Sequence, residues 1–194
     1  MNVLPTAYLA PISYFQHLTQ SSEPEIEIYE TFPKQTLRNR CYILGANSVQ
    51  MLTIPVSKSE SKLTRDIKIS YQQHWQHIHW MAIVSAYKHS AFFDYYADYL
   101  EPFYTQSWEW LVDYNSEQTS VILALLHNQP TSRPTIPTTN TWQGNDLEPI
   151  WEGNITPYYQ LFTADFVNNL SIIDLLFNMG AESFSVLQNY EKAN

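Results

Sequence analysis

The sequence predicts a mixed α/β fold, in which a small mixed sheet from the N-terminal third packs on a C-terminal helical half. Residues 25–30 read Glu-Ile-Glu-Ile-Tyr-Glu, and this alternation with period two is typical of a half-buried strand. Residues 37–44 and 49–56 are two further strand-like arms that flank a Gly-Ala-Asn-Ser turn, which predicts a β-hairpin. After residue 70 the apolar residues follow a helical spacing, so helices replace strands along the chain.

The N-terminal third begins with a strand–helix–strand pattern. Residues 2–9 are mostly apolar, as in a short buried strand, and Pro11 suits the first turn of a helix that continues through Leu18. A Glu-Pro pair at 23–24 ends this helix before the alternating strand begins. Two strands joined by a helix commonly pair in parallel, so we expect a βαβ unit. The alternation at 66–70 predicts one more short strand.

The helical half begins at residues 72–89, a segment that is apolar on most sides, and a helix of this kind belongs inside a protein. A serine opens each of two further predicted helices, at 90–100 and at 116–126. Near the C-terminus, residues 171–174 read Ser-Ile-Ile-Asp, which resembles a capping box, and Gly180 is placed to end the helix that follows.

The composition excludes several classes of protein. The 194 residues include 10 Lys and Arg against 19 Asp and Glu, and the net charge of −9 argues against nucleic acid or an anionic membrane as a partner. Only 4 glycines are present, too few for a glycine-rich phosphate loop, so the sequence identifies no cofactor. Cys41 is the single cysteine, the N-terminus lacks a signal-peptide pattern and no apolar run approaches a membrane span, so we expect a cytoplasmic protein.

The densest group of cations in the sequence is the first candidate for chemistry. It comprises Lys34, Arg38 and Arg40, with Asn39 between the two arginines. On a strand, Arg38 and Arg40 face the same side, where two guanidinium groups can bind a phosphate or carboxylate. The alternative is ion pairing with the carboxylates of the 25–27 strand, since exposed ion pairs are common. Asn39 then faces the other side as a buried polar group that needs partners.

A group of histidines is the second candidate. His74 and His77 share a helix face, but His79 projects elsewhere, so the spacing does not favour a metal site. His79 lies on the same arc as Trp75 and Ile83, which places it in the core or at the wall of a pocket. An imidazole in such a place can serve as a general base, and the alternative is a hydrogen-bonded core histidine.

With these residues in view, the chain resembles the WbqC-like family in a form typical of Bacteroidetes bacteria. The matching stretches, which occur in this order, are 8–15 (YLAPISYF), 34–43 (KQTLRNRCYI), 52–56 (LTIPV), 79–87 (HWMAIVSAY) with the Phe-Phe pair at 92–93, and 169–177 (NLSIIDLLF). One departure is Ala10, where many members of the family have proline.

The resemblance covers nearly the whole chain and implies that residues 1–194 form a single WbqC-like domain. Its expected parts are a sheet-rich part at 1–70, a helical part at 71–127, a Pro-rich excursion at 128–157, and C-terminal helices at 158–194. The resemblance also implies a site around Tyr8, Tyr14, Asn39, Arg40 and His79. Similar proteins occur in gene clusters for surface polysaccharide. The resemblance further implies, from some members of the family, the attachment of an amino acid or acyl group to an amino sugar on a nucleotide carrier.

Two hypotheses follow. The first is a small-molecule acyl or aminoacyl transferase that acts on an amino sugar in surface-polysaccharide biosynthesis. In it Arg40, with Lys34 or Arg38, binds a phosphate or carboxylate of the ligand, and His79 is the general base. The second is a non-catalytic ligand-binding or assembly protein in which these residues are structural. Either hypothesis expects a small-molecule ligand and leaves a homo-oligomer open.

Overall fold

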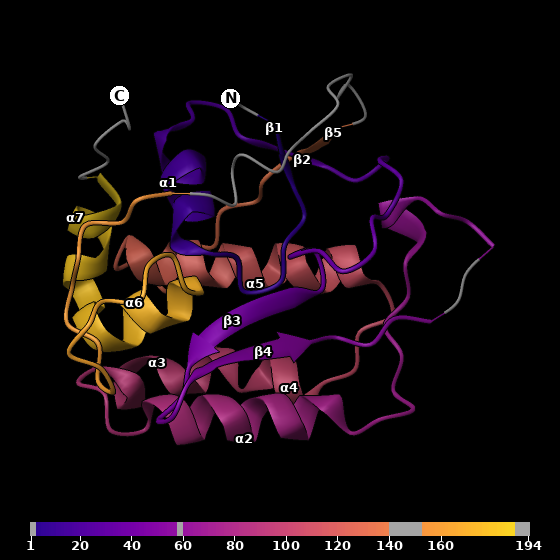
Figure 1. Cartoon of the computed structure of the whole chain (residues 1–194). Helices are drawn as coiled ribbons and strands as arrows, with labels where there is room; N and C mark the ends of the chain where they lie inside the picture. The colour runs from indigo at the N-terminus through magenta and orange to yellow at the C-terminus, as the bar shows by residue number, and fades with distance from the viewer. Residues whose placement is uncertain (1–2, 58–59, 140–152, 189–194) are drawn as a thin grey trace.

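Helices and short strands are mixed along the chain, which confirms the predicted α/β class (Figure 1). The structure is a computed structural model that describes residues 3–57, 60–139 and 153–188. The strands are β1 (Val3–Pro5), β2 (Glu25–Glu27), β3 (Arg40–Leu44), β4 (Val49–Thr53) and β5 (Thr138–Thr139). The helices are α1 (Ile12–Gln20), α2 (Trp75–Tyr87), α3 (Phe93–Leu100), α4 (Pro102–Thr105), α5 (Leu111–Leu126), α6 (Ile172–Met179) and α7 (Ser183–Gln188), with 3-10 turns η1 (Thr64–Asp66) and η3 (Gly180–Glu182).

The predicted βαβ unit is confirmed. β1 and β2 pair in parallel, with Val3 opposite Glu25, and α1 joins them. β5, from the predicted Pro-rich excursion, adds a third parallel strand beside β2, and the amide of Ile26 donates to the carbonyl oxygen of Pro137 over 2.8 Å. Residues 140–152 of that excursion lie outside the described residues. The parallel sheet therefore has the strand order β1-β2-β5.

The predicted hairpin is confirmed but is shorter than its sequence pattern. β3 and β4 pair from Arg40 opposite Thr53 to Leu44 opposite Val49. Residues 34–39 form turns instead of extending the first arm, and Gln35 there has a φ of 60°. The expectation that Arg38 and Arg40 share one strand face is therefore wrong, because only Arg40 belongs to the strand.

Residues 66–70 do not form the predicted strand. Their backbone bonds go to separate loops instead of one neighbouring strand: the amide of Ile69 donates to Glu109 over 3.0 Å, and that of Ser70 to Pro55 over 2.8 Å. The segment contains only isolated bridges, Ile69 to Val56 and Lys68 to Trp110. Alternation along the chain therefore marks the buried side chains of this segment but not a regular ladder.

The helix predicted at 72–89 is present as α2, but its expected position inside the protein is wrong. Trp75 and Ile83 are buried, whereas Ile78 is 59% exposed and Met81 is 50% exposed. α2 lies at the lower edge of the molecule in Figure 1, so only one of its faces meets other elements. Although α2 is apolar on most sides, one of its apolar faces is exposed to solvent.

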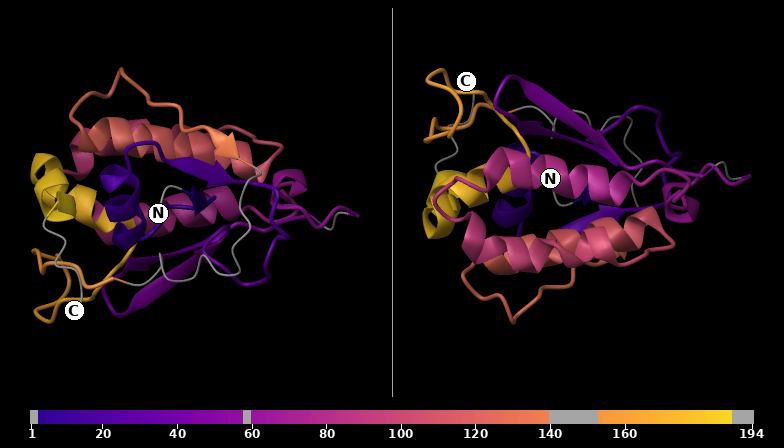
Figure 2. Two further views of the ribbon diagram at one scale, coloured as in Figure 1. Left: turned by 90° about the horizontal axis from the view of Figure 1, so that it is seen from above. Right: turned by 90° about the horizontal axis from the view of Figure 1, so that it is seen from below.

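α5 is the longest helix among the described residues, and 13 of its 16 residues are buried. It begins at Leu111, five residues before the predicted start, because the polar residues 113–120 continue the helix instead of opening it. Seen from above, α5 and the β3–β4 hairpin lie on opposite sides of the molecule, with α1 between them (Figure 2). Buried side chains of strands and helices form one core cluster that includes Leu4, Ile43 and Phe177.

The start of α3 differs from the prediction, whereas α6 starts where predicted but lacks the predicted capping bond. Phe92, not a serine, is the N-cap residue of α3. Ser171 is the N-cap residue of α6, but its side chain makes no capping hydrogen bond, so the prediction of a capping box is wrong. The predicted end of α6 is confirmed at Gly180, which has a φ of 57°. No helix within the described ranges combines the length and the apolar character that a membrane crossing requires.

Candidate functional site

A pocket of about 260 Å³, which we call the α5 pocket, lies between α5 and the parallel strands β1 and β2. Thr6 and Ala7, directly after β1, form one wall with Ile26 of β2. The side of α5 from 113 to 120 and the segment 134–136 form the others. Ile26 is the middle residue of β2 and the segment 134–136 precedes β5, so the lining is not confined to one edge of the parallel sheet.

Asn115 gives the α5 pocket an unsatisfied hydrogen-bond acceptor. Its side chain is 1% exposed, and Nδ2 donates to Thr6 Oγ1 over 3.1 Å and to the carbonyl oxygen of Arg38 over 2.8 Å. Its Oδ1 is buried and has no hydrogen-bond partner among the residues that the structure describes. A buried acceptor without a partner costs about 1–3 kcal/mol, and a ligand hydroxyl or amine in the pocket would supply the missing donor.

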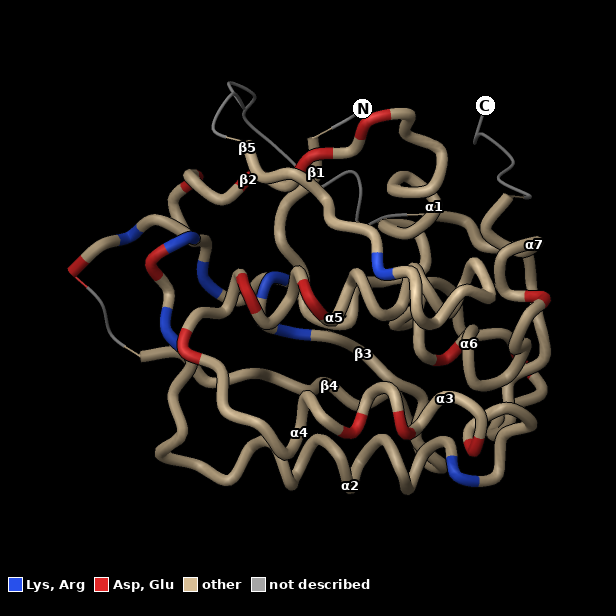
Figure 3. Tube along the Cα trace, turned by 180° about the vertical axis from the view of Figure 1, so that it is seen from behind, with Lys and Arg blue, Asp and Glu red and all other residues tan. Residues whose placement is uncertain are grey.

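The charge of the α5 pocket is negative. Asp113 and Glu117 line it, and no described lining residue is Lys or Arg. Acidic positions along α5 are red in Figure 3. Arg133 reaches Glu117 from outside the lining, with Nη1 2.6 Å from Oε1. Trp108 adds an aromatic wall, and its Nε1 is a buried donor with no partner in the described structure. Carboxylates, free amide and indole groups, and an aromatic ring together suit a polyhydroxylated ligand that is neutral or positively charged.

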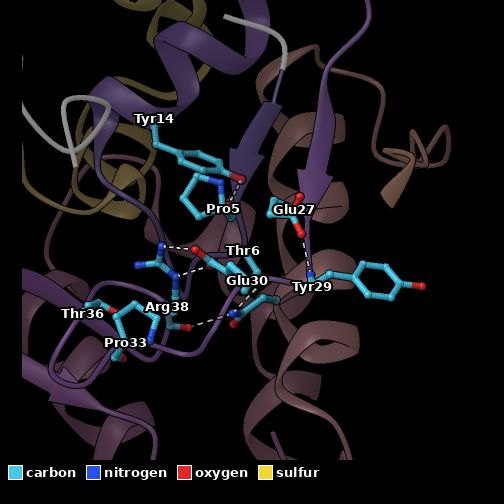
Figure 4. A network of polar contacts seen from close by, with 10 residues as sticks. Pro5, Thr6, Tyr14, Glu27, Tyr29, Glu30, Pro33, Thr36 and Arg38 are labelled. Atoms are coloured by element: carbon cyan, nitrogen blue, oxygen red, sulfur yellow. Dashed lines mark hydrogen bonds and ion pairs between the residues drawn. The ribbon is translucent and has the colours of Figure 1, made fainter. Parts of the chain in front are cut away.

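Tyr14 is the one predicted site residue that lines the α5 pocket. It projects from α1, and its hydroxyl donates to the carbonyl oxygen of Pro5 over 3.0 Å (Figure 4). Burial raises the pKa of Tyr14, so the hydroxyl stays protonated at neutral pH. Tyr14 thereby holds the end of β1 in place beside the pocket.

Arg38 forms a buried ion pair with Glu30 and not with the 25–27 strand. Nε lies 2.5 Å from Oε1, and Nη2 donates to Oε2 over 2.7 Å (Figure 4). The two side chains are only 4% and 16% exposed. This bidentate pair occupies two of the three guanidinium nitrogens, and the third, Nη1, is buried without a partner among the described residues.

The residues that flank Arg38 are placed differently. Asn39 Nδ2 donates to the carbonyl oxygen of Ile54 over 2.9 Å, whereas its Oδ1 and the Nε of Arg40 are buried with no partner in the described structure. Lys34 is exposed in the preceding turn. Each of the three consecutive residues 38–40 therefore has one buried side-chain atom without a partner among the described residues. This is unusual, because buried polar groups are nearly always paired.

His79 is enclosed by aromatic side chains. Its Nδ1 lies 2.9 Å from the hydroxyl of Tyr8, which lies 3.1 Å from the hydroxyl of Tyr104. Burial lowers the pKa of His79 to about 4, against the opposing effect of a hydrogen bond to the backbone of Thr53. The ring is therefore neutral at pH 7, and Nδ1 accepts a hydrogen bond from the Tyr8 hydroxyl. A base of such low pKa is a weak proton acceptor near neutral pH.

The structure brings some of the predicted residues together. His79 bonds the backbone of Thr53, which is the strand partner of Arg40, so His79 and Arg40 lie at the same end of the hairpin. Neither of them lines the α5 pocket. Tyr8 belongs to the His79 cluster, whereas Tyr14 belongs to the pocket. The predicted residues are thus divided between two places.

Asn115 was not among the residues predicted from sequence. A signal for it exists: Asn115, Gln118 and Thr119 are polar at spacings of three and four, which places them on one helix face, and all three are buried. Gln118 Oε1 accepts from the amide of Leu9 over 3.2 Å, so this polar face is bonded to the chain that follows β1. No group of three His, Cys, Asp or Glu side chains within the described ranges is placed to hold a metal ion.

The fold and the pocket together define an α/β protein with a cavity of small-molecule size between α5, β1 and β2. The chain belongs to the WbqC-like protein family, whose model matches residues 6–135 and 128–186. No curated protein and no solved structure is similar enough to the chain to count as a match.

Proposed function

We propose that this protein binds a small amine-bearing molecule, an amino sugar, in the α5 pocket. The observation that carries the proposal is the Oδ1 atom of Asn115, which is buried at the pocket wall without a partner among the described residues. The volume of about 260 Å³ lies just below the roughly 300–1,000 Å³ of pockets for drug-sized ligands, which suits a single sugar ring.

Each part of an amino sugar has a counterpart in the lining. Asn115 Oδ1 accepts from a hydroxyl or the amine, Trp108 offers a ring face and a free indole N–H, and Asp113 attracts an ammonium group. A partly open site of this charge favours the protonated amine over a neutral analogue of the same shape.

Calorimetric titration of the protein with glucosamine and with glucose tests the proposal. We expect glucosamine to bind more tightly, and to raise the melting temperature as its concentration increases. Asp113→Asn should lower the affinity for glucosamine and leave that for glucose unchanged. Asp98→Asn is the matched control, because Asp98 is exposed on α3 and does not line the pocket. Binding of neither sugar would contradict the proposal.

A second candidate is the acyl or aminoacyl transferase that acts on an amino sugar in surface-polysaccharide biosynthesis. The observation that favours it is the pair of buried donors, Arg38 Nη1 and Arg40 Nε, which an anionic group of the acyl donor would satisfy. In this reaction the amine nitrogen attacks the acyl carbonyl carbon and a C–N bond forms. The bond to the leaving group breaks with its electron pair, and the amine proton passes to a base.

His79 distinguishes the two candidates. If it is the base, His79→Gln abolishes formation of N-acylglucosamine from glucosamine and acetyl coenzyme A or an aminoacyl adenylate, as followed by mass spectrometry, and the protein stays folded. If His79 is a core residue, the same variant unfolds more easily and binds glucosamine with unchanged affinity. The sealed position and low pKa of His79 favour the second outcome.

A further inference from the structure

We propose that the α5 pocket is one half of an elongated site, and that the ligand carries a second amine in an adjoining cavity, as a disaccharide of two amino sugars does. This inference rests on the proposed function, because it takes the first amino sugar to lie in the α5 pocket.

The adjoining cavity, which we call the distal cavity, has a volume of about 670 Å³. Pro134, Thr135 and Ile136 line both it and the α5 pocket, so a single stretch of chain borders the two. Both also follow α5: the pocket lies beside Asn115, and the distal cavity lies beside Leu123. Eight residues of helix separate these positions by about 12 Å, so the two cavities suit two linked rings better than one.

Few contacts hold the shared stretch of chain. Ser120 Oγ donates to the carbonyl oxygen of Pro134 over 2.6 Å. The amide of Ile26 donates to the carbonyl oxygen of Pro137 over 2.8 Å. Thr135 is exposed and Ile136 is half-buried. Hydrogen bonds therefore connect the two ends of this stretch to α5 and to β2. Its middle, Thr135 and Ile136, lines the proposed elongated site.

The distal cavity is also suited to a positive charge. Glu23 and Glu25 line it, together with residues at the carboxyl ends of α1 and α5, where helices carry partial negative charge. His127 is the one basic side chain among its described lining residues, since none of them is Lys or Arg. With Asp113 and Glu117 of the α5 pocket, four carboxylates border the elongated site.

This distribution of charge selects the class of ligand. Two linked amines can meet carboxylates in both cavities, although Glu117 is already paired with Arg133, whereas a phosphate would meet an excess of like charge. The elongated site therefore takes an amino sugar that is free of the nucleotide carrier implied by the family resemblance.

Four probes test the inference by calorimetric titration: glucosamine, the β-1,4-linked disaccharide of glucosamine, the same disaccharide with both amines acetylated, and UDP-glucosamine. We expect the free disaccharide to bind at least tenfold more tightly than glucosamine, with a gain that decreases at high salt. We expect the acetylated disaccharide to lose this gain and UDP-glucosamine to bind no more tightly than glucosamine.

Glu25→Gln locates the second amine. The variant should bind the disaccharide no more tightly than glucosamine, while its affinity for glucosamine stays unchanged, because Glu25 borders only the distal cavity. Glu182→Gln, an exposed change outside both cavities, is the control and should keep the tenfold difference.

The outcomes separate the two proposals. If glucosamine binds but the disaccharide binds equally well, or if the acetylated or nucleotide-linked probe binds more tightly, the elongated site is overturned and the proposed function stands. If glucosamine and the disaccharide both fail to bind, the proposed function itself fails.

Discussion

Buried polar side chains distinguish this protein at the scale of single residues. Asn115 Nδ2 donates a hydrogen bond to the carbonyl oxygen of Arg38. Each of these two side chains also has one buried polar atom without a partner among the described residues. His79 differs, because the Tyr8 hydroxyl and the backbone of Thr53 occupy its ring nitrogens. Burial thus leaves one polar atom of each of the first two side chains without a described partner, whereas the polar atoms of His79 are paired.

The Arg38–Glu30 pair should matter strongly for stability. Arg38→Ala leaves the half-buried carboxylate of Glu30 without its partner, so we expect the free energy of unfolding to fall by up to about 3–5 kcal/mol. Glu109→Ala, which breaks the exposed pair with Lys68, should cost less than about 1 kcal/mol. Urea unfolding measures both, and equal losses would show that the burial of the Arg38 pair has no energetic consequence.

His79 should make the protein less stable in mild acid. Its pKa is about 4 in the folded state against an ordinary value of 6.5, so the unfolded chain binds a proton before the folded protein does. The stability that this difference provides is complete above about pH 6.5 and is lost as the pH falls to 4. The loss is about 3 kcal/mol.

Urea unfolding of wild type and His79→Gln at pH 7 and at pH 4.5 measures this contribution. The variant should lose less stability between the two pH values than wild type does. His89→Gln, at an exposed position, is the control and should respond to pH as wild type does. A His79→Gln variant with the pH response of wild type would contradict the assignment.

At the scale of elements, α2 has two apolar faces with different surroundings. Ile83 is fully buried, whereas Ile78, on the same helix, is 59% exposed. Ile83→Ala should lower the free energy of unfolding by about 2–5 kcal/mol, because it leaves a cavity in the core. Ile78→Ala should change it by less than about 0.5 kcal/mol. Thermal and urea unfolding of the two variants compare the same substitution at both faces, and similar losses would mean that the outer face is covered in solution.

At the scale of the whole molecule, Asp174 of α6 joins parts of the chain that are distant in sequence. It accepts from the hydroxyls of Tyr87 over 2.9 Å and Tyr158 over 2.5 Å, and from Gln160 Nε2 over 3.1 Å. Tyr87 in turn accepts from the amide of Leu44 at the end of β3. Burial raises the pKa of Asp174, although these three donors act against the increase. One carboxyl group therefore connects α2, α6, the hairpin and the 158–160 segment.

Asp174→Ala removes the shared acceptor of this network. Three buried or half-buried donors then lack their partner, so we expect a loss of at least about 2 kcal/mol in the free energy of unfolding. Tyr158→Phe removes one donor and should cost about half as much or less. If Asp174→Ala proves no more harmful than Tyr158→Phe in urea unfolding, the network does not join these elements energetically.

Local patterns were enough to predict the α/β class, the parallel β1–β2 pair, the hairpin and the end of α6 at Gly180. Each of these depends on residues that are close in sequence: a period of two, a turn between two arms, or a glycine with a positive φ. Local patterns gave wrong predictions where contacts between distant segments decide the structure. Examples are the missing strand at residues 66–70 and the exposed apolar face of α2.

The candidate site is a property of the folded molecule. Sequence periodicity placed His79 in the interior, and the density of cations singled out residues 34–40. Neither observation showed whether these polar groups meet a ligand or one another. Arg38 meets Glu30 eight positions away, His79 meets Tyr8 71 positions away, and Asn115 meets Thr6 109 positions away. Hydrogen-bond partners at such separations depend on how the elements pack. The sequence by itself therefore determined most of the elements, while their packing decided which polar atoms have a partner among the described residues.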